Sequence, residues 1–181
     1  MKIVGADLSI SATGIARHNG DMITVGGKPA LGDQRLIIIE DELILALGLW
    51  HDEDDDRADL LVVEGSVARS QTAYISGQLH GIVKRLCIRH GMPYVFVPPA
   101  TLKAYATGKG NGDKTQMAIA ALKRAGREFR DDNQCDAAWL RWAALDHYGL
   151  AEFSMPQAHR ERLAKVSWPM IGARSAAVTG S

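Results

Sequence analysis

Short apolar runs rich in β-forming residues open the chain, and longer amphipathic stretches follow them. The first three runs predict strands at 2–8, 13–17 and 22–25. An Asn-Gly pair between the second and third runs is typical of a tight hairpin, because both residues tolerate a positive φ. We therefore expect the fold to open with three antiparallel strands.

Strands and helices alternate in the rest of the chain. The run Leu60–Val63 is continuously apolar, which is typical of a strand covered on both faces. A further strand is predicted at 93–97. Helical periodicity predicts helices at 35–50, 72–90, 101–105, 113–125 and 134–148. This order predicts an α/β fold with a mixed five-stranded sheet, in which three antiparallel strands precede two parallel ones and helices cover both faces.

Composition is that of an ordinary soluble domain. The 181 residues are 46% hydrophobic and 23% charged, which excludes a disordered chain. We expect a single domain at 1–169 and a flexible C-terminal tail at 170–181. No apolar run reaches the ~18 residues of a membrane helix, and no signal peptide is recognisable. Two cysteines are too few for a Cys-cluster zinc site and are compatible with a reducing cytoplasm.

Charge is balanced overall but unevenly distributed. The formal net charge is zero, yet it is −7 for residues 1–83 and +7 for residues 84–181. A neutral chain can therefore still present a basic surface that attracts phosphates, although such asymmetry is common and decides nothing alone. We interpret the acidic run at 52–59 as a solvated loop rather than a metal site, because its like charges repel one another.

Carboxylates end two of the predicted strands. Asp7 ends the first strand and Glu64 ends the buried one. If these strands are neighbours, the two carboxylates lie side by side and raise each other's pKa unless a cation lies between them. Mg²⁺ is a natural cation for such a site because it prefers oxygen ligands. A strand-end Asp alone, however, is more often a turn residue.

A further acidic cluster opens the last long helix. Asp132 and Asp136 are four residues apart and so share a helical face. Asp136 precedes apolar residues, so its side chain faces the protein and needs a partner. The cluster could also be a helix N-cap. Together with the strand-end carboxylates, it favours two-metal hydrolysis of a phosphodiester.

Lysines flank a glycine-rich loop at Gly108–Gly112. Lys103 precedes this loop, Lys109 lies within it and Lys114 follows it. Small residues let backbone N–H groups approach phosphates, and lysines supply positive charge. The spacing is not that of a P-loop, and a solvated loop is the alternative.

Four ordered segments resemble the RuvC-type Holliday junction resolvases, especially divergent forms from phages of actinobacteria. They are IVGADLSISATGIA, LLVVEG, VPPATLKAYATGKGNGDK and DDNQCDAAWL, within about residues 1–150. The resemblance implies an RNase H-like fold, a homodimer, and cutting of four-way and other branched DNA. It also implies Mg²⁺, with Mn²⁺ as a substitute, two ions per active site, products with 5′-phosphate and 3′-hydroxyl ends, and a location in the bacterial host cytoplasm.

By position, the resemblance implies roles for individual residues. The implied metal ligands and catalytic carboxylates are Asp7, Glu64, Asp132 and Asp136, with Lys114 near the cut phosphate. The implied DNA-binding residues are Lys103, Lys109, Lys114 and Arg69.

The family's fourth acidic or His ligand commonly lies three residues before the last Asp, where this chain has Asn133. Asp132 is the favoured substitute, and Asp131 stays open. Residues 66–72 resemble the loop that probes the junction centre but lack an evident aromatic wedge.

Other function classes fit less well. An actin-like or hexokinase-like ATPase needs a second similar domain, for which 181 residues leave no room. Two alternatives remain: a branched-DNA-binding protein that has lost catalysis, and an RNase H-type nuclease acting on RNA/DNA hybrids.

Overall fold

The fold is built on one mixed five-stranded sheet. The computed structural model describes residues 1–50, 56–66 and 73–171. Its strands are β1 (Ile3–Asp7), β2 (Thr13–Ala16), β3 (Met22–Val25), β4 (Leu60–Glu64) and β5 (Tyr94–Val97). Their order is β3-β2-β1-β4-β5; β1, β2 and β3 pair antiparallel, whereas β4 is parallel to both β1 and β5. The predicted strand directions are thus confirmed.

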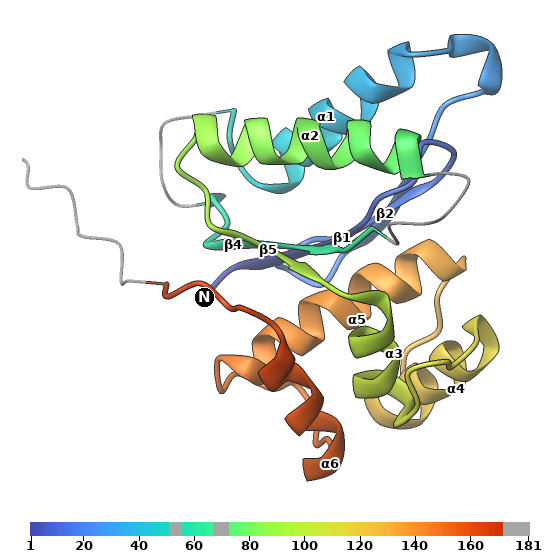
Figure 1. The fold of residues 1–181 in the computed structure, drawn as a ribbon, viewed down its shortest axis with the longest axis vertical. Coiled ribbons are helices and arrows are strands. Elements are labelled where there is room, and N and C mark those ends of the chain that lie inside the picture. The colour runs from blue at the N-terminus through green and yellow to red at the C-terminus, as the bar shows by residue number, and fades with distance from the viewer. Residues whose placement is uncertain (51–55, 67–72, 172–181) are drawn as a thin grey trace, which may run out of the picture.

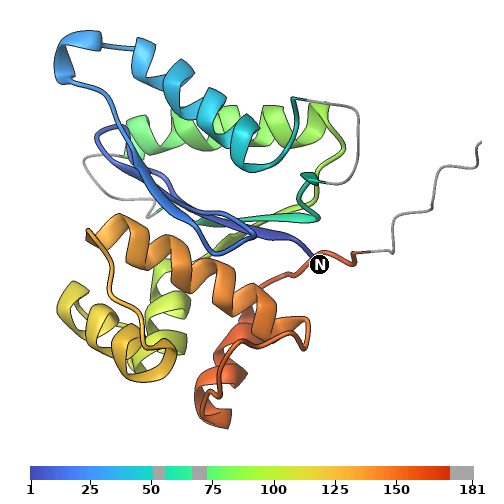
Figure 2. The same cartoon turned by 180° about the vertical axis from the view of Figure 1, so that it is seen from behind.

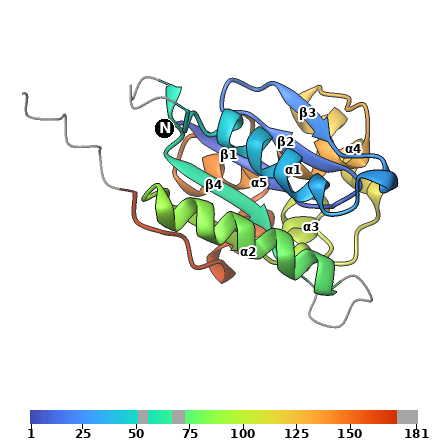
Figure 3. The same cartoon turned by 90° about the horizontal axis from the view of Figure 1, so that it is seen from above.

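Helices cover both faces of the sheet, as predicted. They are α1 (Gln34–Ala46), α2 (Ala73–Arg89), α3 (Pro99–Thr107), α4 (Lys114–Ala125), α5 (Asp132–His147) and α6 (Gln157–Arg160). Short 3₁₀ turns lie at Pro29–Leu31 and Glu161–Lys165. In Figures 1 and 2, α1 and α2 lie on one side of the sheet and the other helices on the opposite side. Figure 3 shows α1 and α2 running over the strands.

The alternation of side chains along β4 explains why its sequence is apolar throughout. Leu60 and Val62 belong to the core under α5, which we call the α5-side core. Leu61 and Val63 belong to the core under α1 and α2, the α2-side core. Successive side chains of a strand point to opposite faces, so a strand buried on both faces has no polar alternation.

Helix α5 lies directly on the sheet because two strand positions are glycines. A Cβ at Gly5 of β1 would collide with the carbonyl oxygen of Ala137, and a Cβ at Gly14 of β2 would collide with that of Asn133. Glycine lets two backbones approach this closely because it has no Cβ. The helix is therefore positioned by main-chain contact with β1 and β2.

Three helices differ from their predicted limits by two or more residues. Helix α1 ends at Ala46 rather than at residue 50, because Gly48 follows with a left-handed φ of 66°. Helix α3 begins at Pro99 rather than near residue 101, because proline is well tolerated in the first turn of a helix. It ends at Thr107, and the next residue, Gly108, caps it with a left-handed φ of 84°. Helix α5 begins at Asp132, two residues earlier than predicted, because Asp131 caps it.

The segment after α5 packs back onto α3 and α5. Arg160 donates to the buried carboxylate of Asp146 at 2.8 Å, and the Tyr105 hydroxyl donates to the same carboxylate at 3.1 Å. Trp168 stacks on His147 with ring centroids 4.6 Å apart. Of the predicted tail, residues 172–181 lie outside the described residues. No helix in the described ranges is long and apolar enough to cross a membrane.

Candidate active site

Asp7 and Glu64 lie side by side where β1 and β4 end. Ala6 pairs with Val63 in the parallel ladder, and Asp7 and Glu64 are the next residues of the two strands. Asp7 lies on the same face as Gly5, which contacts α5. Glu64 continues the alternation of β4 and points to the α5 side as well. The two strands are therefore neighbours, and this register places the two carboxylates next to each other.

Asp136 of α5 brings a third carboxylate to this edge. Burial raises the pKa of Asp7 from 3.8 to about 7, and repulsion from Asp136 adds to the shift. Burial, followed by repulsion from Asp7 and Asp136, raises the pKa of Glu64 to about 8. Burial raises the pKa of Asp136 to about 6. We call Asp7, Glu64 and Asp136 the carboxylate cluster; its negative charge is only partly compensated.

Two lysines partly compensate the carboxylate cluster. Lys114, the first residue of α4, lowers the pKa of all three carboxyl groups. Lys103 of α3 lowers those of Glu64 and Asp136. Lys114 also forms an ion pair with Asp132. The structure thus brings two of the three predicted lysines, Lys103 and Lys114, close to the cluster.

The donor chemistry of the carboxylate cluster fits a hard divalent cation. Carboxylate oxygens are the ligands that Mg²⁺ prefers, and a cation between the groups would remove the repulsion that raises their pKa values. Within residues 1–50, 56–66 and 73–171, however, no three His, Cys, Asp or Glu side chains are close enough together to bind one ion. Ligation of an ion by three of these carboxylates therefore needs their side chains to move closer together. The four-carboxylate metal site stays a prediction.

The start of α5 distinguishes the three candidates for the fourth ligand. The Asp131 carboxylate accepts a hydrogen bond of 2.6 Å from the Thr24 hydroxyl and one of 2.9 Å from the Gln134 backbone N–H. Asp131 therefore serves as the N-cap of α5. The Asn133 carbonyl faces Gly14. Asp132, paired with Lys114, is the acidic residue of the three that is not engaged as a cap.

Two residues near the cluster were not anticipated. Thr24 of β3 ties the start of α5 to the sheet through Asp131, and a hydroxyl on an edge strand gives no signal in sequence. His80 of α2 donates from Nε2 to the Glu64 carbonyl oxygen at 3.0 Å, and its ring packs edge-on against Phe96. In the sequence, His80 stands out only as a polar residue that follows the apolar Leu79, which the structure buries.

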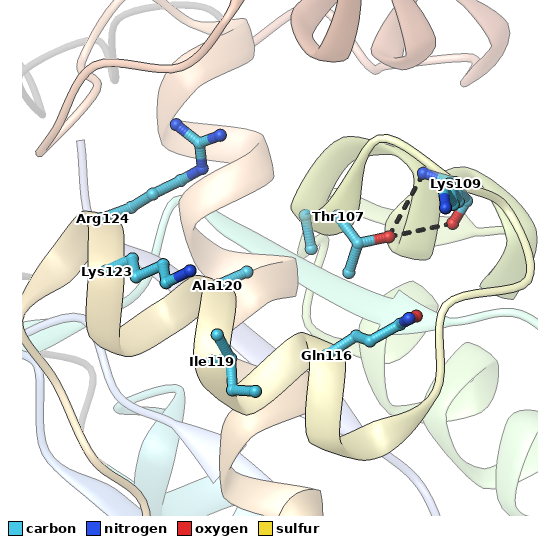
Figure 4. A pocket seen from close by; sticks show the side chains of 8 residues that line it. Thr107, Lys109, Gln116, Ile119, Ala120, Lys123 and Arg124 are labelled. Carbon is cyan, nitrogen blue, oxygen red and sulfur yellow. Dashed lines mark hydrogen bonds between the residues drawn. The ribbon is translucent and has the colours of Figure 1, made fainter.

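Of the other predicted site residues, Lys109 is the one that the structure describes. Lys109 lines a hollow between α3 and α4 rather than the carboxylate cluster (Figure 4). Arg69 lies outside the described residues, as do residues 52–55 of the acidic run. Asp56 of that run is largely exposed and bonds to His18 at 3.0 Å, as a solvated loop residue would.

We expect the metal-free protein to lose stability as pH rises. The folded-state pKa values of the cluster are raised, so folding is favoured while the groups are protonated. The contribution of the protonated cluster to the free energy of unfolding is complete below about pH 4 and is lost as pH rises through about 6 to 8. Urea unfolding in EDTA between pH 5 and 8.5 measures it. Glu64→Gln should lose less stability over this range than wild type. Equal slopes for the two proteins would contradict the expectation.

The chain is similar in sequence to known RuvC proteins, although no protein-family model matches it. It is 27% identical over 172 residues to the crossover junction endodeoxyribonuclease RuvC of Cutibacterium acnes, covering 91% of this chain and 81% of that protein. It is also 27% identical over 188 residues to RuvC of Nocardia farcinica, covering 91% and 96% of the two chains. The resemblance of the four segments to RuvC-type resolvases is thereby confirmed over most of the chain.

The fold is similar to that of a solved RuvC. Thermus thermophilus RuvC superposes with a TM-score of 0.64 at 20% identity, covering 85% of this chain and all of that chain. A second structure, T. thermophilus RuvC in complex with a Holliday junction substrate, also gives a TM-score of 0.64. The likeness confirms the RNase H-like arrangement of sheet and helices.

Proposed function

We propose that this chain, a divergent relative of the RuvC-type Holliday junction resolvases, is a metal-dependent endonuclease that cuts four-way junctions and related branched DNA. The observation that carries the proposal is the carboxylate cluster, Asp7, Glu64 and Asp136, with Lys103 and Lys114 beside it. Buried carboxylates with raised pKa values at the end of a sheet are typical of a functional site.

The residues of the site divide the work between ion binding and phosphate binding. Asp7, Glu64, Asp132 and Asp136 are proposed to hold two Mg²⁺ ions, or Mn²⁺ in their place. Such ions supply activation of water and stabilisation of the leaving oxygen in phosphodiester hydrolysis. Lys114, freed from Asp132, and Lys103 place positive charge where the phosphate enters. We propose products with 5′-phosphate and 3′-hydroxyl ends.

Symmetric cutting of a junction needs two active sites. We propose a homodimer in which each protomer cuts one of two strands of like polarity, each protomer being a single nuclease domain spanning 1–169. Its similarity to two crossover junction endodeoxyribonucleases supports branched DNA as the substrate. A bacterial cytoplasm is the proposed location.

A labelled four-way junction tests the proposal. We expect paired nicks in Mg²⁺ and none in EDTA, with linear duplex DNA of the same sequence as a control. Junction binding without cleavage in either Mg²⁺ or Mn²⁺ would identify a DNA-binding protein that has lost catalysis. Faster cleavage of an RNA/DNA hybrid in the same assay would identify an RNase H-type enzyme instead.

A further inference from the structure

A hollow of about 420 Å³ lies between α3 and α4, separate from the carboxylate cluster. It is lined by Ala106, Thr107, Lys109, Gln116, Ile119, Ala120, Lys123 and Arg124. Three of these residues are cationic and none is acidic. Figure 4 shows Lys123 and Arg124 on α4 and Lys109 on the loop across from Gln116. The lining of the hollow therefore combines apolar and positively charged residues.

Hydrogen bonds fix both walls of the hollow. The Thr107 hydroxyl accepts the Lys109 backbone N–H at 3.2 Å and lies 2.8 Å from the Lys103 carbonyl oxygen, to which it donates. On the other wall, Gln116 and Asp113 form a capping box with bonds of 2.8 and 3.2 Å. The loop and the start of α4 are thus held in place before any ligand binds.

The cations of the hollow are not neutralised by the fold. In the part of the chain that the structure describes, no carboxylate forms an ion pair with Lys109, Lys123 or Arg124. Basic residues in the last turn of a helix interact favourably with the helix dipole, and this could explain Lys123 and Arg124 without any ligand. It does not account for Lys109, which reaches the same hollow from another element.

We propose that this hollow is a second phosphate site, which holds the backbone of a DNA arm a few nucleotides from the cut. The proposal rests on the proposed function. Helix α4 begins beside the carboxylate cluster with Lys114, and Lys123 is nine residues further on, about 13 Å along the axis at ~1.5 Å per residue. Nine residues are two and a half turns at ~3.6 residues per turn, so Lys123 also lies on the face of α4 opposite Lys114. One strand of a duplex carries a phosphate every ~3.4 Å of axis, so a strand that contacts both residues spans at least about four nucleotides between them.

The chemistry of the lining suits a sugar–phosphate backbone. Lys123 and Arg124 supply charge to phosphate oxygens, and arginine can bind them with two parallel hydrogen bonds. Ile119 is 46% exposed and gives an apolar surface beside the cations, suited to the deoxyribose. No base-reading arrangement is needed, so the contact positions an arm without selecting its sequence.

The salt dependence of junction binding in EDTA tests the second phosphate site. We expect the double variant K123Q/R124Q to bind a long-armed junction about 10-fold more weakly at moderate salt. Its log K against log[salt] slope should be less steep by about 2, because two phosphate contacts are lost. The matched control K2Q/R89Q removes one lysine just before β1 and one arginine at the end of α2, neither of which lines the hollow. An equal change in slope in this control would assign the effect to net charge and overturn the proposal.

Neutral phosphates locate the contact on the DNA. Single methylphosphonates are placed one to eight nucleotides from the cut on either side. We expect weaker wild-type binding at two neighbouring positions four or more nucleotides away, and no further loss there in K123Q/R124Q, because the methylphosphonate and the substitutions remove the same contacts. Additive losses at every position would overturn the proposal.

Loss of the second phosphate site and absence of nuclease activity give different results in these experiments. Wild-type cleavage of the junction with an unchanged salt slope in K123Q/R124Q would reject the second phosphate site and keep the proposed nuclease. A wild-type protein that neither binds nor cuts branched DNA would reject both.

Discussion

Asp7→Asn removes metal-dependent cleavage of a four-way junction and leaves junction binding within about two-fold of wild type. The change keeps the shape of the side chain but removes one negative charge from the carboxylate cluster, where Asp7 and Glu64 end adjacent strands. Loss of an ion's contribution of several kcal/mol corresponds to on the order of 10³-fold or more in rate. Single-turnover cleavage in Mg²⁺ and binding in EDTA measure the two effects.

The control for Asp7→Asn is Asp41→Asn, which removes the same charge from an exposed position on α1. It should cut and bind as wild type does. Metal-dependent cutting that survives in Asp7→Asn would place the chemistry at another site and contradict the proposed function.

Gly14→Ala lowers the free energy of unfolding by about 2–4 kcal/mol and abolishes cleavage. The new Cβ would meet the Asn133 carbonyl oxygen and lie 3.0 Å from its Cβ, so the start of α5 must move off the sheet. Backbone contacts cannot relax as a flexible side chain can, so the cost is at the upper end of overpacking effects. Asp136 moves with the helix, away from Asp7. Urea unfolding and the junction assay report the two changes.

Gly81→Ala is the matched control for Gly14→Ala. Gly81 lies on an exposed part of α2, and a Cβ there would meet nothing within 4 Å. Alanine should raise stability by about 0.5–1 kcal/mol, because glycine costs more entropy in a helix. A Gly14→Ala protein as stable as wild type would show that α5 does not depend on this contact.

The strands and most helices could be predicted because their signals are local. The run Leu60–Val63 differs from β4 by one residue, and Met22–Val25 matches β3. Asp113 and Gln116 form a capping box within four residues of sequence, so the start of α4 could be predicted from local sequence. Asp7 and Glu64 could be recognised as strand ends, whereas their position side by side depended on β1 pairing with β4, which the structure shows.

The rest of the site depends on contacts between distant parts of the chain. Thr24 and Asp131 are 107 residues apart, so the cap that sets the start of α5 has no sequence pattern. Gly14 looks like an ordinary strand glycine until the helix above it is known. Lys123 looks like the usual basic end of a helix, and only the convergence with Lys109 distinguishes it.

The glycine contacts beneath α5 also bear on how this chain can evolve. Where α5 meets β1 and β2 at Gly5 and Gly14, main chain lies against main chain. The spacing of Asp136 from Asp7 therefore depends on two positions that must stay glycine. We expect apolar substitutions on α1 and α2, on the far side of the sheet, to change this spacing less than any side chain added at Gly5 or Gly14. Sequence drift should accordingly be better tolerated on that side of the molecule than at the two glycines.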